Sequence, residues 1–332
     1  MSQIKVFLFV STLAITSFCH LIMAQKSVPL DKDKPLKGEG IYSFLTRHNR
    51  LPSEYMEAFI DINKDKLGKN NNLLANYEYV LPPLTNEKTI PLFGPDHEKV
   101  TIQSNELKGA VIYLVNGHGG PDPGAIGIYG DHHLHEDEYA YDISLRLAKN
   151  LMERGAKVHI IIQDPSDGIR KDKFLSNSNN ETCMGEPIPL DQIARLKQRT
   201  VKINELYAKD TEAYRRSIII HLDSRSKRKQ IDVFFYHHLN SSKGAHLAKV
   251  LRQTCENNYK KHQPYRGFSG TVSNRNLYIL RKTKPVSVFI ELGNIQNYRD
   301  QQRFILENNR QALANWITEG IKKDFNHYNK NK

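Results

Sequence analysis

The sequence predicts an α/β fold, in which a mostly parallel sheet is flanked by helices and a small βααβ domain precedes it. From about residue 108 onward, short β-rich runs alternate with helical patterns, which is typical of a parallel sheet covered by helices. The run SIII at 217–220 is apolar without interruption, as expected of a strand buried on both faces. A hydrophobic content of 39% in 332 residues is ample for a packed core.

The first 24 residues predict a secretory signal peptide. They contain one early lysine, Lys5, then an apolar run, and end at the small residue Ala24. Retention as an anchor and lipidation at Cys19 are the alternatives, although His20 interrupts the apolar run. No later stretch approaches membrane-spanning length, so we expect an exported chain in the periplasm or cell envelope with no integral span after cleavage.

Residues 36–83 predict a small separate domain. IYSFLTRH at 41–48 reads as a first helix, and SEYMEAFIDIN at 53–63 as a second helix with Ser53 as its N-cap. YEYVLP at 77–82 reads as a closing strand, while the first strand is indistinct. A helical spacer is the alternative. Two proline clusters and a polar stretch then predict a linker over residues 84–107.

Residues 108–328 form the predicted second, larger domain. A helix is expected from about Glu136, and strands are expected at 110–115, 158–162, 217–222, 232–236, 277–280 and 286–292.

Charge and cysteine content limit the partners. The formal charge is +12, which predicts attraction to polyanions. Because nucleic acid is a poor partner for an exported protein, anionic cell-wall polymers or membrane surfaces fit better, and a merely basic surface is the alternative. The run RSKRK at 225–229 is expected in a solvated loop. Cys183 and Cys255 either form one disulfide or stay free.

Three ionisable residues occur where predicted strands end. His118 follows the strand in VIYLVNGHGGPDPGAIG, His221 ends IIIHLD, and Glu291 ends VFIELGN. Ligand sites of open α/β sheets lie at the carboxyl ends of the strands. Each residue alone has a structural explanation, but together they indicate a site, and the surrounding glycines let the backbone turn sharply and approach a ligand closely.

The helix that follows HHLH contributes a carboxylate. Its apolar stripe recurs at four-residue spacing: Tyr139, Ile143, Leu147 and Leu151. Glu136 lies on this stripe and is predicted to point inward, whereas Glu138 falls with Asp142 on a more polar side. The histidines at 132, 133 and 135 are expected in a loop around the cleft, and one of them replacing Glu136 as a ligand is the alternative.

Two histidines and a carboxylate with an open fourth position are a typical set of ligands for catalytic Zn²⁺. Zinc lowers the pKa of a bound water, which attacks a carbonyl while a nearby carboxylate moves the proton. We predict His118, Glu136 and His221 as metal ligands and Glu291 as the catalytic carboxylate. The HExxH helix of many zinc proteases is absent from the sequence.

Residues from about 109 to 325 resemble the zinc-dependent N-acetylmuramoyl-L-alanine amidases of bacterial cell-wall turnover. The resemblance rests on GHGGPDPGAIG, the E-x5-DI-x-L-R-L helix from Glu136, IIIH at His221, and LYILRKTKPVSVFIELGNIQN at 277–297. It implies the same residues in the same roles: His118, Glu136 and His221 bind zinc and Glu291 acts in catalysis. The implied substrate is peptidoglycan, cut between N-acetylmuramic acid and L-alanine.

The sequence departs from the family pattern at several positions. Leu222 and Asp223 stand where Ala-Asn is frequent, and Gln163 and Asp164 stand where an arginine is usual. Residues 165–196 form a longer, more polar segment than expected, which is either a lid or autoinhibitory element, or an exposed loop.

Residues 36–83 resemble a LysM module, a small fold that binds the sugar backbone of peptidoglycan. Ala75 and Asn76 stand where a Gly-Gln pair is usual. The alternatives for the whole chain are a catalytically inactive peptidoglycan-binding or regulatory protein on an amidase fold, and a zinc exopeptidase acting on free peptides. The sequence leaves open whether an activator protein is required.

Overall fold

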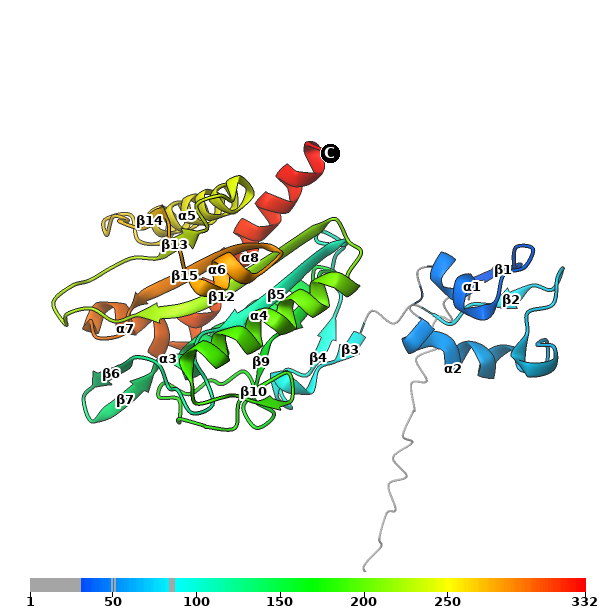
Figure 1. The fold of residues 1–332 in the computed structure, drawn as a ribbon, viewed down its shortest axis with the longest axis horizontal. Coiled ribbons are helices and arrows are strands. Elements are labelled where there is room, and N and C mark those ends of the chain that lie inside the picture. The colour runs from blue at the N-terminus through cyan, green and yellow to red at the C-terminus, as the bar shows by residue number, and fades with distance from the viewer. Residues whose placement is uncertain (1–30, 49, 51, 84–86) are drawn as a thin grey trace, which may run out of the picture. The chain divides into compact units, whose positions relative to one another are not determined.

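The computed structural model describes residues 31–48, 50, 52–83 and 87–332 (Figure 1). The predicted signal peptide at residues 1–24 lies outside the described residues. The chain divides into two compact units, Met1–Leu84 and Thr85–Lys332, and each is described by itself.

The first unit has the predicted order of strand, helix, helix and strand. Its elements are β1 (Lys32–Asp33), α1 (Ile41–Arg47), α2 (Pro52–Asn63), the short 3₁₀ helix η1 (Lys69–Asn71) and β2 (Tyr79–Val80), and β1 pairs antiparallel with β2. Phe44, Phe59 and Tyr79 are fully buried at its centre. Helix α2 begins at Pro52, so Ser53 is not its N-cap as predicted. Proline is favoured at the first helical position because the N–H it lacks would be unpaired there.

The second unit is built on a six-stranded sheet in the order β14-β13-β15-β12-β5-β8. Strands β5, β8, β12 and β15 are mutually parallel, while β13 runs antiparallel to β15 and parallel to β14. This confirms the predicted mixed α/β fold with a mostly parallel sheet. The strands of this sheet are β5 (Ala110–Asn116), β8 (Lys157–Ile160), β12 (Tyr214–Asp223), β13 (Phe234–His237), β14 (Thr271–Asn274) and β15 (Val286–Asn294).

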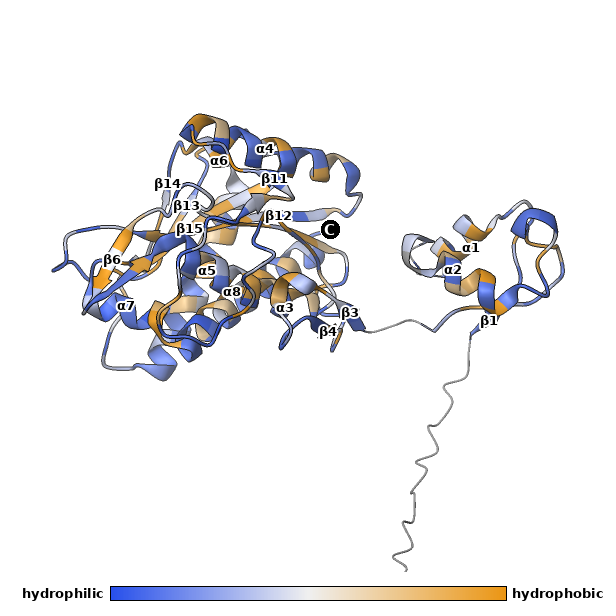
Figure 2. Ribbon diagram, turned by 90° about the horizontal axis from the view of Figure 1, so that it is seen from below, coloured by the Kyte–Doolittle hydropathy of each residue, from blue (hydrophilic) through white to orange (hydrophobic). Residues whose placement is uncertain are grey.

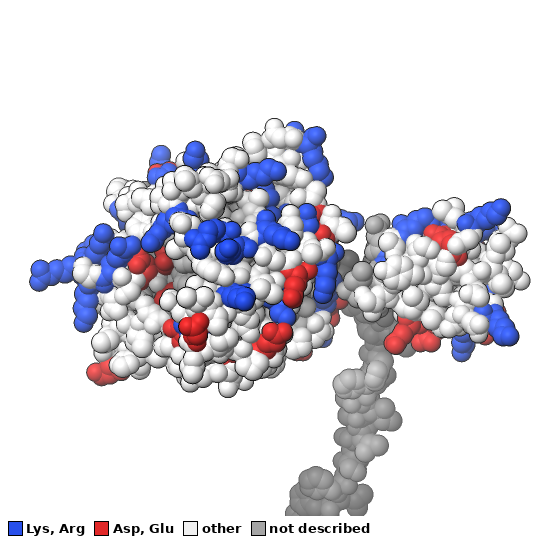
Figure 3. Space-filling view, viewed as in Figure 1, with Lys and Arg blue, Asp and Glu red and all other residues white. Residues whose placement is uncertain are grey.

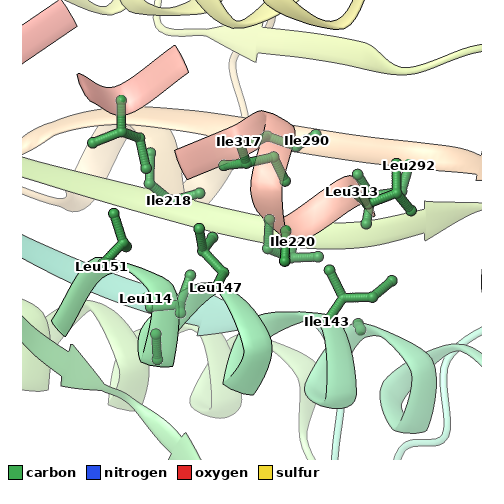
Figure 4. Close-up of a cluster of buried hydrophobic side chains, with 14 of the residues drawn as sticks. Leu114, Ile143, Leu147, Leu151, Ile218, Ile220, Ile290, Leu292, Leu313 and Ile317 are labelled. Atoms are coloured by element: carbon green, nitrogen blue, oxygen red, sulfur yellow. The ribbon is translucent and has the colours of Figure 1, made fainter. Parts of the chain in front are cut away.

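Helices cover both faces of this sheet, which lies between them in Figure 2. Their bounds are α3 (Glu136–Met152), α4 (Gln192–Lys209), α5 (Ser242–His262), α6 (Tyr278–Lys282), α7 (Tyr298–Ile305) and α8 (Glu307–Lys330). Helices α3, α5 and α8 pack on one face, where they bury the larger core around Ile218 and Ile220 (Figure 4). Helices α4 and α6 pack on the other face against a smaller core around Ile219.

Smaller elements complete the second unit. They are β3 (Glu87–Thr89), η2 (Pro91–Phe93), β4 (Lys99–Thr101), β6 (Ile126–Tyr129), β7 (His132–His135), β9 (Ile162–Gln163), β10 (Thr182–Cys183) and β11 (Glu186–Pro187). Strands β3 and β4 form an antiparallel pair, as do β6 and β7, and β9 to β11 form a three-stranded sheet.

The linker predicted over residues 84–107 differs from what is observed for residues 87–107. Phe93, Val100 and Leu107 are 0%, 1% and 0% exposed and belong to the larger core. These apolar residues are widely spaced among prolines and charged residues, so they form no periodic pattern in the sequence. The second unit therefore begins earlier than the predicted domain at 108–328.

One predicted strand is a helix, and one observed strand was not predicted. The segment LYIL at 277–280 was expected as a strand, but Tyr278–Lys282 form helix α6, whose Ile279 and Leu280 cover the smaller core. A four-residue apolar run does not distinguish a buried strand from a short helix. Strand β14 was not predicted, because its sequence TVSN is polar and mostly exposed at the sheet edge.

Cys183 and Cys255 are free and buried, and they belong to different cores. Cys183 lies in the smaller core and Cys255 in the larger one, so the sheet separates them and the disulfide alternative is not realised.

The run at 225–229 lies in the exposed loop between β12 and β13, as predicted, and contributes to the lysine and arginine groups in Figure 3. None of the helices in the described ranges combines the length and hydrophobicity needed to span a membrane.

Candidate metal centre

Three of the predicted site residues meet at one end of the sheet. His118 follows β5, Glu136 is the first residue of α3, and His221 lies near the end of β12. One donor atom from each lies within 4.8 Å of the others. The carboxylate of Glu136 is at the centre, since its Oε1 is 2.8 Å from His221 Nδ1 and its Oε2 is 3.3 Å from His118 Nε2.

The backbone around this cluster requires glycine at two positions. A Cβ atom at Gly117 would lie 2.2 Å from the His221 ring, and one at Gly124 would lie 2.7 Å from the His118 ring. His118 itself has a φ of 59°, a left-handed conformation that is rare for a residue with a side chain. Such strain is concentrated at functional sites, where surrounding contacts maintain it. The glycine-rich sequence is therefore explained by the close approach of the three side chains.

A further carboxylate orients His118. Asp122 Oδ2 lies 2.9 Å from His118 Nδ1, and Arg195 Nη2 donates to the same oxygen at 2.6 Å. This contact fixes the ring so that Nε2 points toward Glu136, as carboxylates do behind metal-binding histidines. The sequence interpretation assigned Asp122 only to a turn. Its position four residues after His118 was the available signal.

Burial and charge oppose each other in this cluster. Burial favours the neutral form of Glu136, but His118 and His221 outweigh it and hold the pKa of this carboxyl well below its usual range. Burial also opposes the charged form of His118, yet Asp122 and Glu136 raise the pKa of its imidazole. For His221, burial dominates and lowers the pKa. Two imidazole nitrogens and an ionised carboxylate thus converge, and this donor set fits Zn²⁺ with room for a fourth ligand.

Glu291 lies beside this cluster but is not one of its three converging donors. It lies on β15, three residues before the end of that strand and in register with His221 on β12, and the His221 ring stacks on Phe289 of β15 with 4.3 Å between the ring centroids. Its Oε2 accepts no hydrogen bond from any described residue. Burial, then the charges of Glu136 and Asp223, raise the pKa of Glu291 well above its ordinary value. A carboxyl in this position is suited to hold and release a proton.

Other predicted positions differ in their surroundings. Glu138 and Asp142 were expected on a polar side of α3, yet they are 1% and 0% exposed. Both are compensated by arginine: Arg170 pairs with Glu138 at 2.8 Å, and Arg310 pairs with Asp142 at 2.6 Å. Helix α3 is therefore buried on nearly every side, which four-residue spacing alone could not indicate.

The neighbouring histidines and the long polar segment also have definite positions. The histidines at 132, 133 and 135 lie in strand β7 and not in a loop as expected, and none of them belongs to the three-residue cluster. His132 stacks on Phe174 with 3.6 Å between the ring centroids. Within the segment at 165–196, Leu175 and Ile188 are buried. The segment thus contributes a residue to each core of the second unit and is not simply an exposed loop. Its role as a lid stays a prediction.

A cavity of about 130 Å³ opens beside the cluster on the α4 and α6 face of the sheet. His118 and His221 line it together with apolar residues such as Phe289 and the arginines Arg195 and Arg199. A larger cavity of about 750 Å³ lies between α5, α7 and α8, and none of the clustered residues lines it. The smaller cavity therefore borders two of the three converging residues.

Known proteins resemble the second unit. The germination-specific N-acetylmuramoyl-L-alanine amidase of Bacillus subtilis is 25% identical over 224 residues, which cover 66% of this chain and 81% of that protein. The probable cell wall amidase LytH of Staphylococcus aureus is 28% identical over 232 residues, covering 68% of this chain and 62% of that protein.

Among solved structures, the CwlD amidase of Clostridioides difficile in complex with the GerS lipoprotein is 20% identical, with a TM-score of 0.48. The alignment covers 65% of this chain and 98% of that one. The amidase AmiC2 of Nostoc punctiforme is also 20% identical, with a TM-score of 0.45 and coverage of 65% and 97%. The sequence model of the N-acetylmuramoyl-L-alanine amidase family matches residues 112–323, more than half of the chain. The chain belongs to the N-acetylmuramoyl-L-alanine amidase family.

Proposed function

We propose that this chain is an exported, zinc-dependent enzyme that hydrolyses the amide bond between N-acetylmuramic acid and L-alanine in peptidoglycan. Membership of the amidase family supports the reaction class. The observation that carries the metal assignment is the convergence of His118, Glu136 and His221 within 4.8 Å. Cell wall amidases among its relatives support action in the cell envelope.

The mechanism assigns a separate task to each side chain. Two imidazole nitrogens and the Glu136 carboxylate would hold the zinc ion, and Asp122 keeps His118 in the required orientation. When bound, zinc supplies a water of lowered pKa and an electrophile for the substrate carbonyl. Glu291 accepts the proton of the attacking water and returns it to the leaving nitrogen of L-alanine.

The proposed function is tested with purified sacculi and mass spectrometry of the soluble products. We expect free stem peptides that begin with L-alanine, and glycan that has lost its peptides. Elemental analysis should give one zinc per chain, and His118→Ala should lose both zinc and activity. His133→Ala, which alters an exposed histidine of β7, is the matched control and should lose neither. Binding to sacculi without release of peptide would instead favour an inactive binding protein, and cleavage of free peptides alone an exopeptidase.

Residues 36–83 are proposed as a LysM-like module that binds peptidoglycan. Helices α1 and α2 and strand β2 within these residues, together with β1 at Lys32–Asp33 just before them, support this assignment. Deleting these residues should weaken binding to intact sacculi but spare hydrolysis of soluble muropeptides. High salt should weaken the sacculus binding of the full chain, because exposed charges are screened. Equal loss in the binding and hydrolysis assays would show that the segment belongs to the catalytic fold.

A further inference from the structure

A second cluster of carboxylates lies next to the candidate metal centre. One oxygen from each of Asp137, Glu138 and Glu181 lies within 4.8 Å of the others. The three residues are 1%, 1% and 4% exposed, so water does not solvate them freely. Asp137 and Glu138 follow Glu136 in the first turn of α3. Glu181 comes from the polar segment at 165–196, directly before β10.

Hydrogen bonds from the protein satisfy only part of this cluster. Asp137 Oδ1 accepts the backbone N–H of Glu138 at 2.9 Å, but Asp137 Oδ2 has no hydrogen-bond partner among the described residues. Glu181 Oε2 accepts the backbone N–H of Gly120 at 2.8 Å. A fully buried carboxylate oxygen without a donor is unfavourable, and it indicates that a partner of another kind is required.

The positive charge around the cluster is also insufficient. Arg170 pairs with Glu138 at 2.8 Å, but it also pairs with Asp167 at 2.7 Å. Within the described ranges, no lysine, arginine or histidine forms an ion pair with Asp137 or Glu181. Buried carboxylates are stable when a cation compensates them. Of the three carboxylates, only Glu138 has an arginine partner in the described part of the chain, which Asp167 also uses, and the other oxygen of Glu138 accepts the backbone N–H of Ser178.

We propose that Asp137, Glu138 and Glu181 form a second cation site, distinct from the candidate zinc site and selective for Ca²⁺. The donors are all carboxylate oxygens, which calcium prefers, whereas the adjacent cluster offers the imidazole nitrogens that suit zinc. Calcium binds oxygens at about 2.3–2.6 Å, so oxygens on opposite sides of one ion are about 5 Å apart. Separations within 4.8 Å therefore fit a single calcium coordination sphere.

A cation at this position would connect three segments around the candidate metal centre. Asp137 and Glu138 belong to the helical turn that begins with Glu136. Glu181 belongs to the polar segment, and its carboxylate accepts the backbone N–H of Gly120 in the glycine-rich loop that carries His118. The backbone N–H of Asp137 also donates to Pro123 O of that loop at 3.3 Å. The calcium ion thus has a positioning role, because it stabilises the two backbone segments that carry His118 and Glu136.

The test uses the full chain purified with both metals present. Elemental analysis should find calcium in addition to zinc, and a titration with CaCl₂ should reach saturation near the range of extracellular calcium sites, about 10⁻⁴–10⁻³ M. At a tenfold excess over Kd, calcium should raise the Tm by about 3–6 °C. The variants Asp137→Asn and Glu181→Gln, which come from different segments, should each abolish this shift and the calcium content. Glu186→Gln, an exposed acid on β11, is the matched control and should keep both.

The outcomes distinguish this inference from the proposed function. Zinc without calcium in the purified wild type, with no Tm shift on adding CaCl₂, overturns the second site and leaves the amidase assignment intact. Calcium without zinc overturns the zinc assignment alone. If Asp137→Asn raises the Tm in calcium-free buffer and the wild type binds no calcium, protons and not a metal ion neutralise the cluster. An equal shift with MgCl₂ contradicts the selectivity for calcium.

Discussion

The two faces of the central sheet differ in what covers them. On one face, α3, α5 and α8 bury Ile218 and Ile220 in a continuous core (Figure 4). On the other face, α4 and α6 cover a smaller core around Ile219, and a cavity of about 130 Å³ remains beside His118 and His221. One face is closed by packing, and the other leaves space for a ligand at the end of the strands.

Because of this difference, residues that stabilise the core alternate along a single strand with residues that face the candidate site. Successive residues of a strand point to opposite faces. On β12, Ile220 therefore belongs to the larger core while its neighbour His221 faces the cavity. Glu291 on β15 stands in register with His221, so the same alternation places it toward the site. Substitutions of neighbouring residues on these strands should therefore differ in effect: one should lower stability and the other should lower activity.

The largest contrast is expected between His221→Ala and Ile220→Val. Loss of His221 removes a proposed metal ligand, so zinc content and turnover should fall to background while the larger core stays intact. Ile220 is fully buried, and Ile220→Val should lower the free energy of unfolding by about 0.5–1.5 kcal/mol with normal specific activity. Elemental analysis, calorimetry and a muropeptide assay measure these effects. A zinc-loaded, active His221→Ala protein would show that His221 is not a required ligand, and that the two faces do not differ in the way proposed.

Glu291→Gln should have the next largest effect. The glutamine keeps the shape of the side chain but takes no proton, so turnover should fall by ~10²–10⁴. Zinc should stay bound, because Glu291 is outside the three converging donors. Glu205→Gln, an exposed acid on α4, serves as the control with unchanged turnover. Loss of zinc from Glu291→Gln would make Glu291 a ligand, and lower stability with full activity would make it only a structural residue.

Asp122→Asn should weaken the site without abolishing it. Asp122 contacts the nitrogen of His118 that points away from Glu136, and loss of such a partner typically reduces metal affinity by about 10–100-fold. Competition with a chelator measures this affinity. Asp131→Asn changes an exposed aspartate between β6 and β7 and should leave the affinity unaltered. Unchanged zinc affinity in Asp122→Asn would limit Asp122 to a role in the turn.

The smallest expected effect is a difference in alkylation rate between Cys183 in the smaller core and Cys255 in the larger core. Burial raises the pKa of the Cys183 thiol to about 11 and that of Cys255 to about 12. Raised pKa values reduce the reactive thiolate at pH 8, so both should alkylate slowly in the native protein and faster as the pH rises. Cys183 should react first, because local opening of the small β9–β11 sheet exposes it, whereas Cys255 requires opening of the larger core. Mass spectrometry of the alkylated peptides follows both sites, with unfolded protein as the reference. Equal alkylation rates of Cys183 and Cys255 in the native protein would contradict the expectation that the smaller core opens more readily than the larger one.

Sequence patterns predicted the parts of the fold that rest on local periodicity. The sequence predicts β5, β12 and β15 from apolar runs several residues long. It predicts α3 from an apolar stripe that recurs at four-residue spacing. Segment LYIL was misassigned because four apolar residues contain no period. The sequence does not reveal the three buried residues of the segment 87–107, because Phe93, Val100 and Leu107 are too far apart to form a pattern. Isolated residues of this kind become interpretable only through what they contact.

The sequence by itself placed His118, His221 and Glu291 near the carboxyl ends of strands, and therefore at one end of the sheet. Parallel strands place their carboxyl ends together, so this follows from strand order and local pattern. Only the tertiary structure decided which side chains support them. Arg195 reaches Asp122 across 73 positions of the chain, and Glu181 reaches Gly120 across 61. Such contacts depend on how distant segments pack, and because short-range periodicity carries no information about that packing, the support of the site became apparent only in three dimensions.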